Sequence, residues 1–199
     1  MSDVGEFLEP CAPERPSGWV RAKVLLREIV ETVVLSLIIF FFITTFLLQN
    51  FRVLLSSMEP TLHEGQFIMV NKLAYRLHPP ERGDIVILKY PRNPERDFIK
   101  RIVGLPGEKV EIREGEVHIN DQPLQEPYVR YPGNYSWGPR RVGEDEFFVL
   151  GDNRLNSHDS RAWGMLPREN IVGKAWLCYW PPQCWGLMPS VSFAAPEAE

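Results

Sequence analysis

The sequence has no cluster of lysines and arginines that stands apart from hydrophobic residues, and its formal net charge is −4. A basic patch is the usual mark of a nucleic-acid-binding surface, so we do not expect nucleic acid as a partner. Cysteine is scarce, with three in 199 residues, and no Cys-x-x-Cys or Cys/His ligand spacing occurs. We therefore expect no metal site and no cofactor.

One segment is far more hydrophobic than the rest of the chain. It runs from Ile29 to Leu48 and contains a single charged residue, Glu31. At about 1.5 Å per residue, a helix of this length is roughly 30 Å long and matches the hydrocarbon core of a bilayer. A buried core helix keeps a polar stripe, and a cleaved signal peptide has a shorter apolar region followed by small residues. The segment therefore predicts a retained transmembrane helix.

The charges beside this segment predict its orientation. Only Arg52 follows it closely, whereas four basic residues precede it: Arg15, Arg21, Lys23 and Arg27. Because basic flanks stay on the cytoplasmic side, residues 1–28 should form a cytoplasmic tail and the chain from residue 52 should lie outside the cytoplasm. The sequence thus predicts a single-pass protein of the plasma membrane, with the lipid bilayer as one partner.

Beyond this segment the sequence shows short strands and turns, with no internal repeat and no long amphipathic helix. Glycine and proline are frequent, at 14 and 18 residues. Apolar or alternating runs predict strands at 84–90, 97–103, 109–113, 116–120, 146–150 and 173–180. The third and fourth of these flank Glu114-Gly115, which is typical of a hairpin with one buried face. Residues 123–143 are rich in proline, tyrosine and glycine and predict an irregular stretch.

The cysteines are divided between the two sides of the predicted membrane helix. Cys11 would be cytoplasmic, while Cys178 and Cys184 would lie in the exported part, where a disulfide persists. Pro181-Pro182 could turn the chain back between them, but spacing alone does not fix the geometry that a disulfide needs. Whether the two are bridged stays open at this point.

Three polar segments stand out within the exported part. Ser56 to Leu62 reads SSMEPTL, Phe98 to Gly107 reads FIKRIVGLPG, and Gly151 to Arg161 reads GDNRLNSHDSR. In the second segment, Lys100 and Arg101 fall inside an apolar strand, and because strands alternate faces, one of them must face inward or be covered. A lysine with only its stem packed would be ordinary, but a desolvated lysine has a lowered pKa and can take a proton from a serine hydroxyl.

Together these segments resemble the type I signal peptidases, the bacterial leader peptidases and their organelle relatives. Three boxes, in order behind an N-terminal anchor, carry the resemblance: Ser-Met-x-Pro-Thr-Leu at 57–62, Lys-Arg-x-x-Gly-x-Pro-Gly at 100–107, and Gly-Asp-Asn-Arg-x-x-Ser-x-Asp-Ser-Arg at 151–161. The resemblance runs from the anchor through Pro182. It implies an endopeptidase that removes N-terminal signal peptides from exported preproteins by a Ser/Lys dyad, with those signal peptides as its other partners.

The resemblance assigns a role to each matching residue. Ser57 would attack the scissile carbonyl and form an acyl-enzyme, and neutral Lys100 would accept its proton. Ser157 would hydrogen-bond the Lys100 amine and fix its direction. Leu55 and Met58, on either side of the nucleophile, would contact the substrate. Four further residues would brace the site as two pairs: Asp159 with Arg161, and Asp152 with Arg101.

The resemblance also implies a fold. It is mainly β, with an antiparallel β catalytic core and a smaller inserted β region, preceded by the single transmembrane helix. In this chain the core would comprise residues 51–107 and 146–182, and the insertion would comprise residues 108–145. Residues 183–199 would form a C-terminal tail.

One departure from the family pattern concerns the oxyanion. Many bacterial members carry a serine two residues before the nucleophile, whose hydroxyl helps to bind the oxyanion. This chain has Leu55 at that position, so that side-chain donor is missing. Loss of one such donor typically costs about 2.7–4 kcal/mol in the transition state. Either the backbone N–H of Ser57 suffices together with another group, or the enzyme is slower than its relatives.

The sequence also allows other interpretations. His63 and His158 invite a Ser-His-Asp triad, but His63 lies in a turn with no carboxylate expected to orient it, and His158 occupies a variable position of its box. A self-cleaving Ser/Lys repressor of the LexA type would carry a DNA-binding domain in place of the anchor. A non-catalytic β module tethered at the membrane, an organelle inner-membrane processing peptidase and a specialised pilin-processing relative are the remaining alternatives.

Overall fold

The computed structural model describes residues 18–189, 191 and 193, and the chain divides into two compact units, 1–43 and 44–199. The first unit contains helix α1 (Gly18–Phe42), whose apolar side chains are exposed. None of the helices in the described residues is both long enough and apolar enough to cross a membrane. The predicted transmembrane helix at 29–48 is therefore not confirmed. Cys11, Arg15 and residues 1–17 of the predicted tail lie outside the described residues, as do 190, 192 and 194–199 of the predicted C-terminal tail.

Short strands make up most of the second unit. After α1, the helical elements are the π-helix η1 (Ile43–Leu47), the 3-10 turns η2 (Ser56–Met58), η3 (Arg154–Asn156), η4 (Arg168–Asn170) and η5 (Pro182–Cys184), and the α-helices α2 (Ala74–Leu77) and α3 (Ser160–Trp163). The strands are β1 (Leu48–Arg52), β2 (Phe67–Asn71), β3 (Ile85–Tyr90), β4 (Asn93–Gly104), β5 (Lys109–Arg113), β6 (Glu116–Ile119), β7 (Gln122–Pro123), β8 (Trp137–Arg141), β9 (Glu146–Leu150), β10 (Leu166–Pro167), β11 (Ile171–Trp180) and β12 (Gly186–Leu187).

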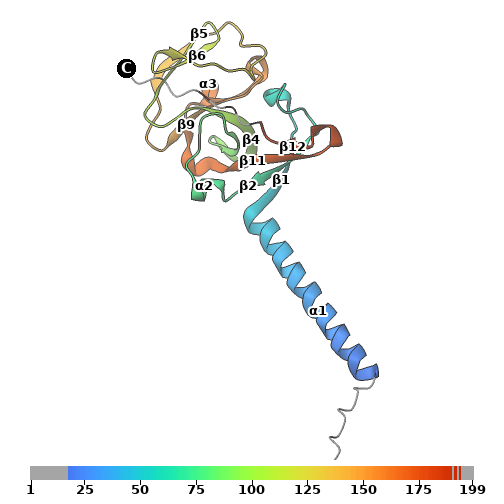
Figure 1. The fold of residues 1–199 in the computed structure, drawn as a ribbon. Helices are drawn as coiled ribbons and strands as arrows, with labels where there is room; N and C mark the ends of the chain where they lie inside the picture. The colour runs from blue at the N-terminus through green and yellow to red at the C-terminus, as the bar shows by residue number, and fades with distance from the viewer. Residues whose placement is uncertain (1–17, 190, 192, 194–199) are drawn as a thin grey trace, which may run out of the picture. The chain divides into compact units, whose positions relative to one another are not determined.

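The strands form two sheets in which neighbouring strands are antiparallel (Figure 1). The larger sheet has the order β1-β2-β11-β3-β4-β9-β10, with β12 added beside β11. The smaller sheet has the order β7-β6-β5-β8 and contains the hairpin β5–β6, seen at one end of the domain in Figure 1. The prediction of a mainly antiparallel β protein is confirmed.

All six predicted strands are present, and the differences arise from pairing between strands. β4 starts four residues before the predicted strand, because its polar first half pairs with the end of β3. β8 falls in the stretch predicted to be irregular: it contains Gly138 and Pro139, which weaken a strand signal, yet it pairs with β5. β1 has no strand signal in its sequence, because Leu48 ends the hydrophobic segment and most of the following residues are polar, but it pairs along its whole length with β2.

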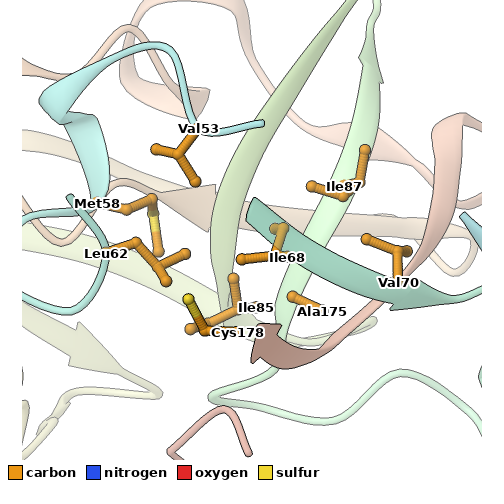
Figure 2. Close-up of a cluster of buried hydrophobic side chains, with 9 residues drawn as sticks. All are labelled: Val53, Met58, Leu62, Ile68, Val70, Ile85, Ile87, Ala175 and Cys178. Atoms are coloured by element: carbon orange, nitrogen blue, oxygen red, sulfur yellow. The ribbon is translucent and has the colours of Figure 1, made fainter. Parts of the chain in front are cut away.

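A buried cluster at one end of the larger sheet supports the segment around Ser57. Figure 2 shows Met58 and Leu62 lying beside Ile85 and Cys178, with Val53 near them. Met58 is fully buried and Leu62 is 2% exposed. The residues that flank Ser57 in sequence are therefore anchored in the core, which fixes the course of the chain at the serine.

The structure decides the question left open for the exported cysteines. Cys178 at the end of β11 and Cys184 in η5 form a disulfide, with their Cα atoms 5.7 Å apart. Pro181 and Pro182 lie between them, and the backbone N–H of Cys184 donates to the carbonyl of Pro181, which closes the turn. The bridge fastens η5 to the strand that packs beside β2.

Candidate active site

Ser57 lies in the 3-10 turn η2, directly after an extended residue. Leu55, with φ −134° and ψ 156°, leads into the turn, and Met58 ends it inside the core. Ser57 itself is 6% exposed. Since the turn has an extended residue before it and a buried residue at its end, the position of the Ser57 hydroxyl is constrained.

That partner is Lys100 in the middle of β4, opposite Val86 of β3. The Lys100 amine lies 2.8 Å from Ser57 Oγ and 2.9 Å from the carbonyl oxygen of Ile99, and it donates to both. Lys100 is 3% exposed. The sequence predicted one inward-facing basic residue, and in fact Lys100 and its neighbour Arg101 are both buried, on opposite faces of the strand.

Burial changes the acid–base behaviour of Lys100. Removal of the ammonium from water lowers the pKa of Lys100 from 10.5 to about 8, and this desolvation is the largest effect on it. The negative charges of Asp159 and Asp152 oppose the shift, while the positive charge of Arg161 adds to it. The neutral amine is thus accessible near neutral pH, as a base acting on a serine hydroxyl requires.

Arg101 lies on the opposite face of β4 from Lys100, where it is buried in an ion pair with Asp152. The guanidinium donates to both carboxylate oxygens of Asp152, at 2.9 and 2.6 Å, and to the carbonyl of Gly83 at 2.8 Å. Tyr128 lies in the connection between β7 and β8, and the centre of its ring is 4.0 Å from the guanidinium carbon. The pair joins β4 to the start of the 151–161 loop.

Asp159 and Arg161 are also paired, and they shape the rest of that loop. Arg161 donates to the Asp159 carboxylate at 2.7 and 2.8 Å, and its guanidinium also reaches the carbonyl of Arg154 at 2.9 Å. Asp159 accepts in addition from the backbone N–H of Gly151 at 3.1 Å. These bonds close the loop back upon its own beginning.

Ser157 does not make the contact predicted for it. Its hydroxyl is buried and has no hydrogen-bond partner in the described residues, so the expected bond to the Lys100 amine is not formed. The amine instead donates to Ile99 and Ser57. Ser157 nevertheless lies close to the site, because a Cβ added to Gly151 would collide with Ser157 Oγ and would fall 2.5 Å from the carbonyl oxygen of Ser57.

Two asparagines for which the sequence predicts no role connect the loop to the turn that carries Ser57. Asn153 donates its backbone N–H to the Ser57 carbonyl at 3.1 Å and its side-chain amide to the Ser56 carbonyl at 3.2 Å. The Asn156 amide donates to the Ser56 hydroxyl at 2.8 Å. Their position within the 151–161 motif is the one sequence feature that could indicate a role at the site, because asparagine is common in polar loops for other reasons.

A model of the family described as signal peptidase, peptidase S26, matches residues 26–180, which include Ser57, Lys100 and the 151–161 loop. The chain belongs to this signal peptidase family. Its members are serine endopeptidases that cleave signal peptides.

Individual relatives agree with that assignment. The signal peptidase I of Leptolyngbya laminosa is 44% identical over 164 residues, which cover 78% of this chain and 80% of that protein. The probable signal peptidase I-2 of Synechocystis sp. is 41% identical over 166 residues, covering 81% and 76%. The chloroplastic thylakoidal processing peptidase 1 of Arabidopsis thaliana is 44% identical over 137 residues, covering 64% and 40%.

A cavity of about 530 Å³ opens beside Ser57 and Lys100. Ser57 and Lys100 line it, together with Leu55 and apolar side chains of β1, β3 and β4 such as Ile87 and Phe98. Leu55 is thus placed where a substrate could touch it. Met58, which was also expected to contact substrate, does not line the cavity, because its side chain is buried in the core.

The two histidines lie away from the serine. Contrary to expectation, His63 has a carboxylate nearby, with Glu59 Oε1 3.6 Å from its Nδ1, but both side chains are exposed and His63 makes no described contact with Ser57. His158 Nε2 lies 3.2 Å from the hydroxyl of Tyr90 and packs against the Tyr90 ring. Lys100 is therefore the basic side chain that the structure brings to Ser57.

Proposed function

We propose that this chain is a membrane-bound serine endopeptidase that removes N-terminal signal peptides from exported preproteins through an acyl-enzyme. The observation that carries the proposal is the 2.8 Å separation between Ser57 Oγ and Lys100 Nζ, in a site where both residues are buried. A desolvated amine beside a serine hydroxyl is the arrangement that a Ser/Lys dyad needs, and the apolar cavity beside it provides room for an extended peptide.

In the proposed chemistry, Ser57 is first acylated by the substrate and the acyl-enzyme is then hydrolysed, with Lys100 moving the protons in both steps. The lone pair of neutral Lys100 accepts the hydroxyl proton as Ser57 Oγ bonds to the scissile carbonyl carbon, and the carbonyl electrons move to its oxygen. The Lys100 ammonium then protonates the leaving amine as the peptide bond breaks. After the mature protein has left, a water molecule gives a proton to the neutral Lys100 amine and its oxygen bonds to the acyl carbon. The bond from that carbon to Ser57 Oγ then breaks, the Lys100 ammonium returns the proton to Ser57 Oγ, and the signal peptide leaves with a new carboxyl end.

The supporting residues are proposed to hold this geometry. Asp152 fixes Arg101 and therefore the β4 backbone beside Lys100, while Asp159 and Arg161 hold the loop whose start touches the Ser57 carbonyl. We assign Ser157 to directing the Lys100 amine during turnover, since its buried hydroxyl has no hydrogen-bond partner in the described residues and is free to form one. Leu55 is assigned to substrate contact.

The membrane part of the proposal assigns residues 29–48 to a single anchor with residues 1–28 in the cytoplasm. From Ile29 through Leu47 the helix and the π-turn after it contain one charged residue, Glu31, and the large apolar side chains of α1 are exposed. Residues 51–107 and 146–182 are proposed as the extracytoplasmic catalytic core, 108–145 as the inserted region and 183–199 as the C-terminal tail. We place this enzyme in the plasma membrane.

The anchor makes a prediction about fractionation. The full chain should stay with membranes after extraction at alkaline pH, because an apolar span is held by the hydrocarbon core rather than by charge. In cells stripped of the envelope layers outside the plasma membrane, with that membrane left intact, added protease should degrade the catalytic domain. Full release of the chain by alkaline carbonate would contradict the proposed anchor, and protection of that domain from protease would contradict its proposed orientation. Neither result would bear on the Ser57/Lys100 mechanism.

Cleavage of a purified preprotein tests the proposed activity. The wild-type enzyme should produce one new N-terminus at the end of the signal peptide, identified by N-terminal sequencing of the product. A Ser57→Ala variant, with an unchanged melting temperature, should give no product and should lose labelling by a serine-directed covalent inhibitor. Cleavage by that variant at the wild-type rate would exclude Ser57 as nucleophile, and a wild-type chain that neither cleaves nor labels would indicate a non-catalytic module.

A further inference from the structure

The start of η2 presents an unused backbone donor at the nucleophile. The first N–H groups of a short helix have no acceptor within it, and the N–H of Ser57 makes no hydrogen bond in the described part of the chain. A single backbone N–H beside the nucleophile is half of an oxyanion-binding site, which usually needs a second donor. Leu55 cannot supply one, because its side chain is apolar and lies exposed at the cavity.

Ser56 is the neighbouring residue with a hydroxyl, and the loop holds it in place from two directions. The Asn153 amide donates to the Ser56 carbonyl at 3.2 Å, and the Asn156 amide donates to Ser56 Oγ at 2.8 Å. Ser56 Oγ thus acts as an acceptor toward Asn156. Its own hydrogen is donated to no acceptor in residues 18–189, 191 and 193.

We infer that the Ser56 hydroxyl is the second oxyanion donor of this enzyme, oriented by Asn156; the inference rests on the proposed Ser57/Lys100 mechanism. Ser56 directly precedes Ser57, so its Oγ lies within a few ångströms of the Ser57 N–H by covalent geometry alone. As Ser57 Oγ bonds to the substrate carbon and the carbonyl electrons move to oxygen, the Ser57 N–H and the Ser56 O–H both donate to that oxygen. No proton is transferred from Ser56.

The contact from Asn156 makes Ser56 a better donor than a free serine side chain would be. A hydroxyl that already accepts a hydrogen bond is polarised, so its own hydrogen is donated more strongly. The amide also limits the rotation of the hydroxyl, and donors fixed in advance need no reorganisation at the moment of reaction. The chain would in this way compensate for the leucine at position 55 with a hydroxyl one residue later.

Steady-state kinetics on a purified preprotein, with the full-length enzyme in detergent, test this inference. Ser56→Ala should lower kcat by about 10²-fold, because one oxyanion donor is worth roughly that factor. KM should change less than about threefold, since the donor acts mainly on the developing charge. Ser56→Thr, which keeps the hydroxyl, should retain most of the activity. Ser136→Ala is the matched control, since Ser136 is exposed and its hydroxyl accepts a hydrogen bond from the Glu114 N–H at 3.4 Å, beside the smaller sheet.

A pair of double variants separates a donor from a merely structural serine. In the Ser56→Ala background, Leu55→Ser should give a kcat at least about tenfold above that of Leu55→Ala, because only the former restores a hydroxyl near the oxyanion. Equal rates for the two double variants, or a Ser56→Ala enzyme within threefold of wild type, would overturn the inference. Absence of cleavage by the wild type itself would instead reject the proposed function.

Discussion

A Lys100→Arg enzyme should cleave a preprotein at least about 10³-fold more slowly than wild type at pH 8, although its positive charge is unchanged. General-base catalysis contributes about 10²–10⁴-fold, and a guanidinium does not deprotonate in this range. The larger, planar group would also have to fit where the Lys100 amine now lies 2.8 Å from Ser57 Oγ, in a place that is 3% exposed. Lys100→Met is uncharged and close in size to lysine, so it removes the base without the steric strain that the larger arginine could cause. It should be as inactive as Lys100→Arg.

Rates from single-turnover cleavage, with melting temperatures for each variant, measure this effect. Lys109→Arg is the matched control, because Lys109 is partly exposed in the smaller sheet and pairs with Asp121 at 2.5 Å. That control should cleave at the wild-type rate. A Lys100→Arg enzyme that is folded and within tenfold of wild type would remove Lys100 from the mechanism and leave Ser57 without a described base.

The pH dependence of the wild-type enzyme reports on the same lysine. Because burial lowers the pKa of Lys100 to about 8, kcat/KM should rise about tenfold per pH unit below that value and level off above it. The sign follows from the base being the deprotonated form. A stability effect accompanies it: the folded state disfavours the ammonium, so Lys100 should make unfolding harder as the pH rises from about 8 toward its ordinary value of 10.5. A rate that falls with rising pH across this range would contradict a neutral lysine base.

The residues at the centre of the site could be predicted because their sequence context is unusual. Lys100 lies in an apolar strand, and Ser57 precedes a Met-x-Pro motif that matches one of three family boxes. The contact partners of those residues could not be predicted. Ser157 was assigned a bond to the Lys100 amine, yet the amine donates to the Ile99 carbonyl, a backbone acceptor that no sequence pattern reveals.

The fold shows the same division between local and distant causes. The β5–β6 hairpin and β9 follow from alternation and turn residues that lie within a few positions of each other. β1 and β8 depend on their partners instead: β2 pairs with the mostly polar stretch at the end of the hydrophobic segment, and β5 pairs with a strand that contains Gly138 and Pro139. Tertiary pairing overrides weak local preference in both cases.

Loss of the Asp152 carboxylate should be the most damaging single change away from the dyad. Arg101 is fully buried, and Asp152→Ala would leave its guanidinium with the Gly83 carbonyl, the Thr61 hydroxyl and the Tyr128 ring but without a counter-charge. Breaking a buried ion pair from one side typically costs about 3–5 kcal/mol, which is a large share of the stability of a domain. Urea unfolding should show this loss, whereas Asp121→Asn in the exposed Lys109–Asp121 pair, which removes the charge but suits the positive φ of 68° at that position, should leave the midpoint unchanged.

A second variant shows whether the charge itself is responsible. Replacing both partners, as in Arg101→Met with Asp152→Leu, removes the unpaired charge and should recover at least half of the stability lost in Asp152→Ala, because apolar pairs of similar volume often replace buried ion pairs without loss. Activity should not recover to the same extent, since Arg101 adjoins Lys100 in β4 and Asp152 begins the loop that contacts the Ser57 turn. A double variant as unstable as Asp152→Ala would assign the loss to packing. Full activity in the double variant would show that the pair supports the fold alone and that the dyad geometry is held by Asp159, Arg161 and the core around Met58.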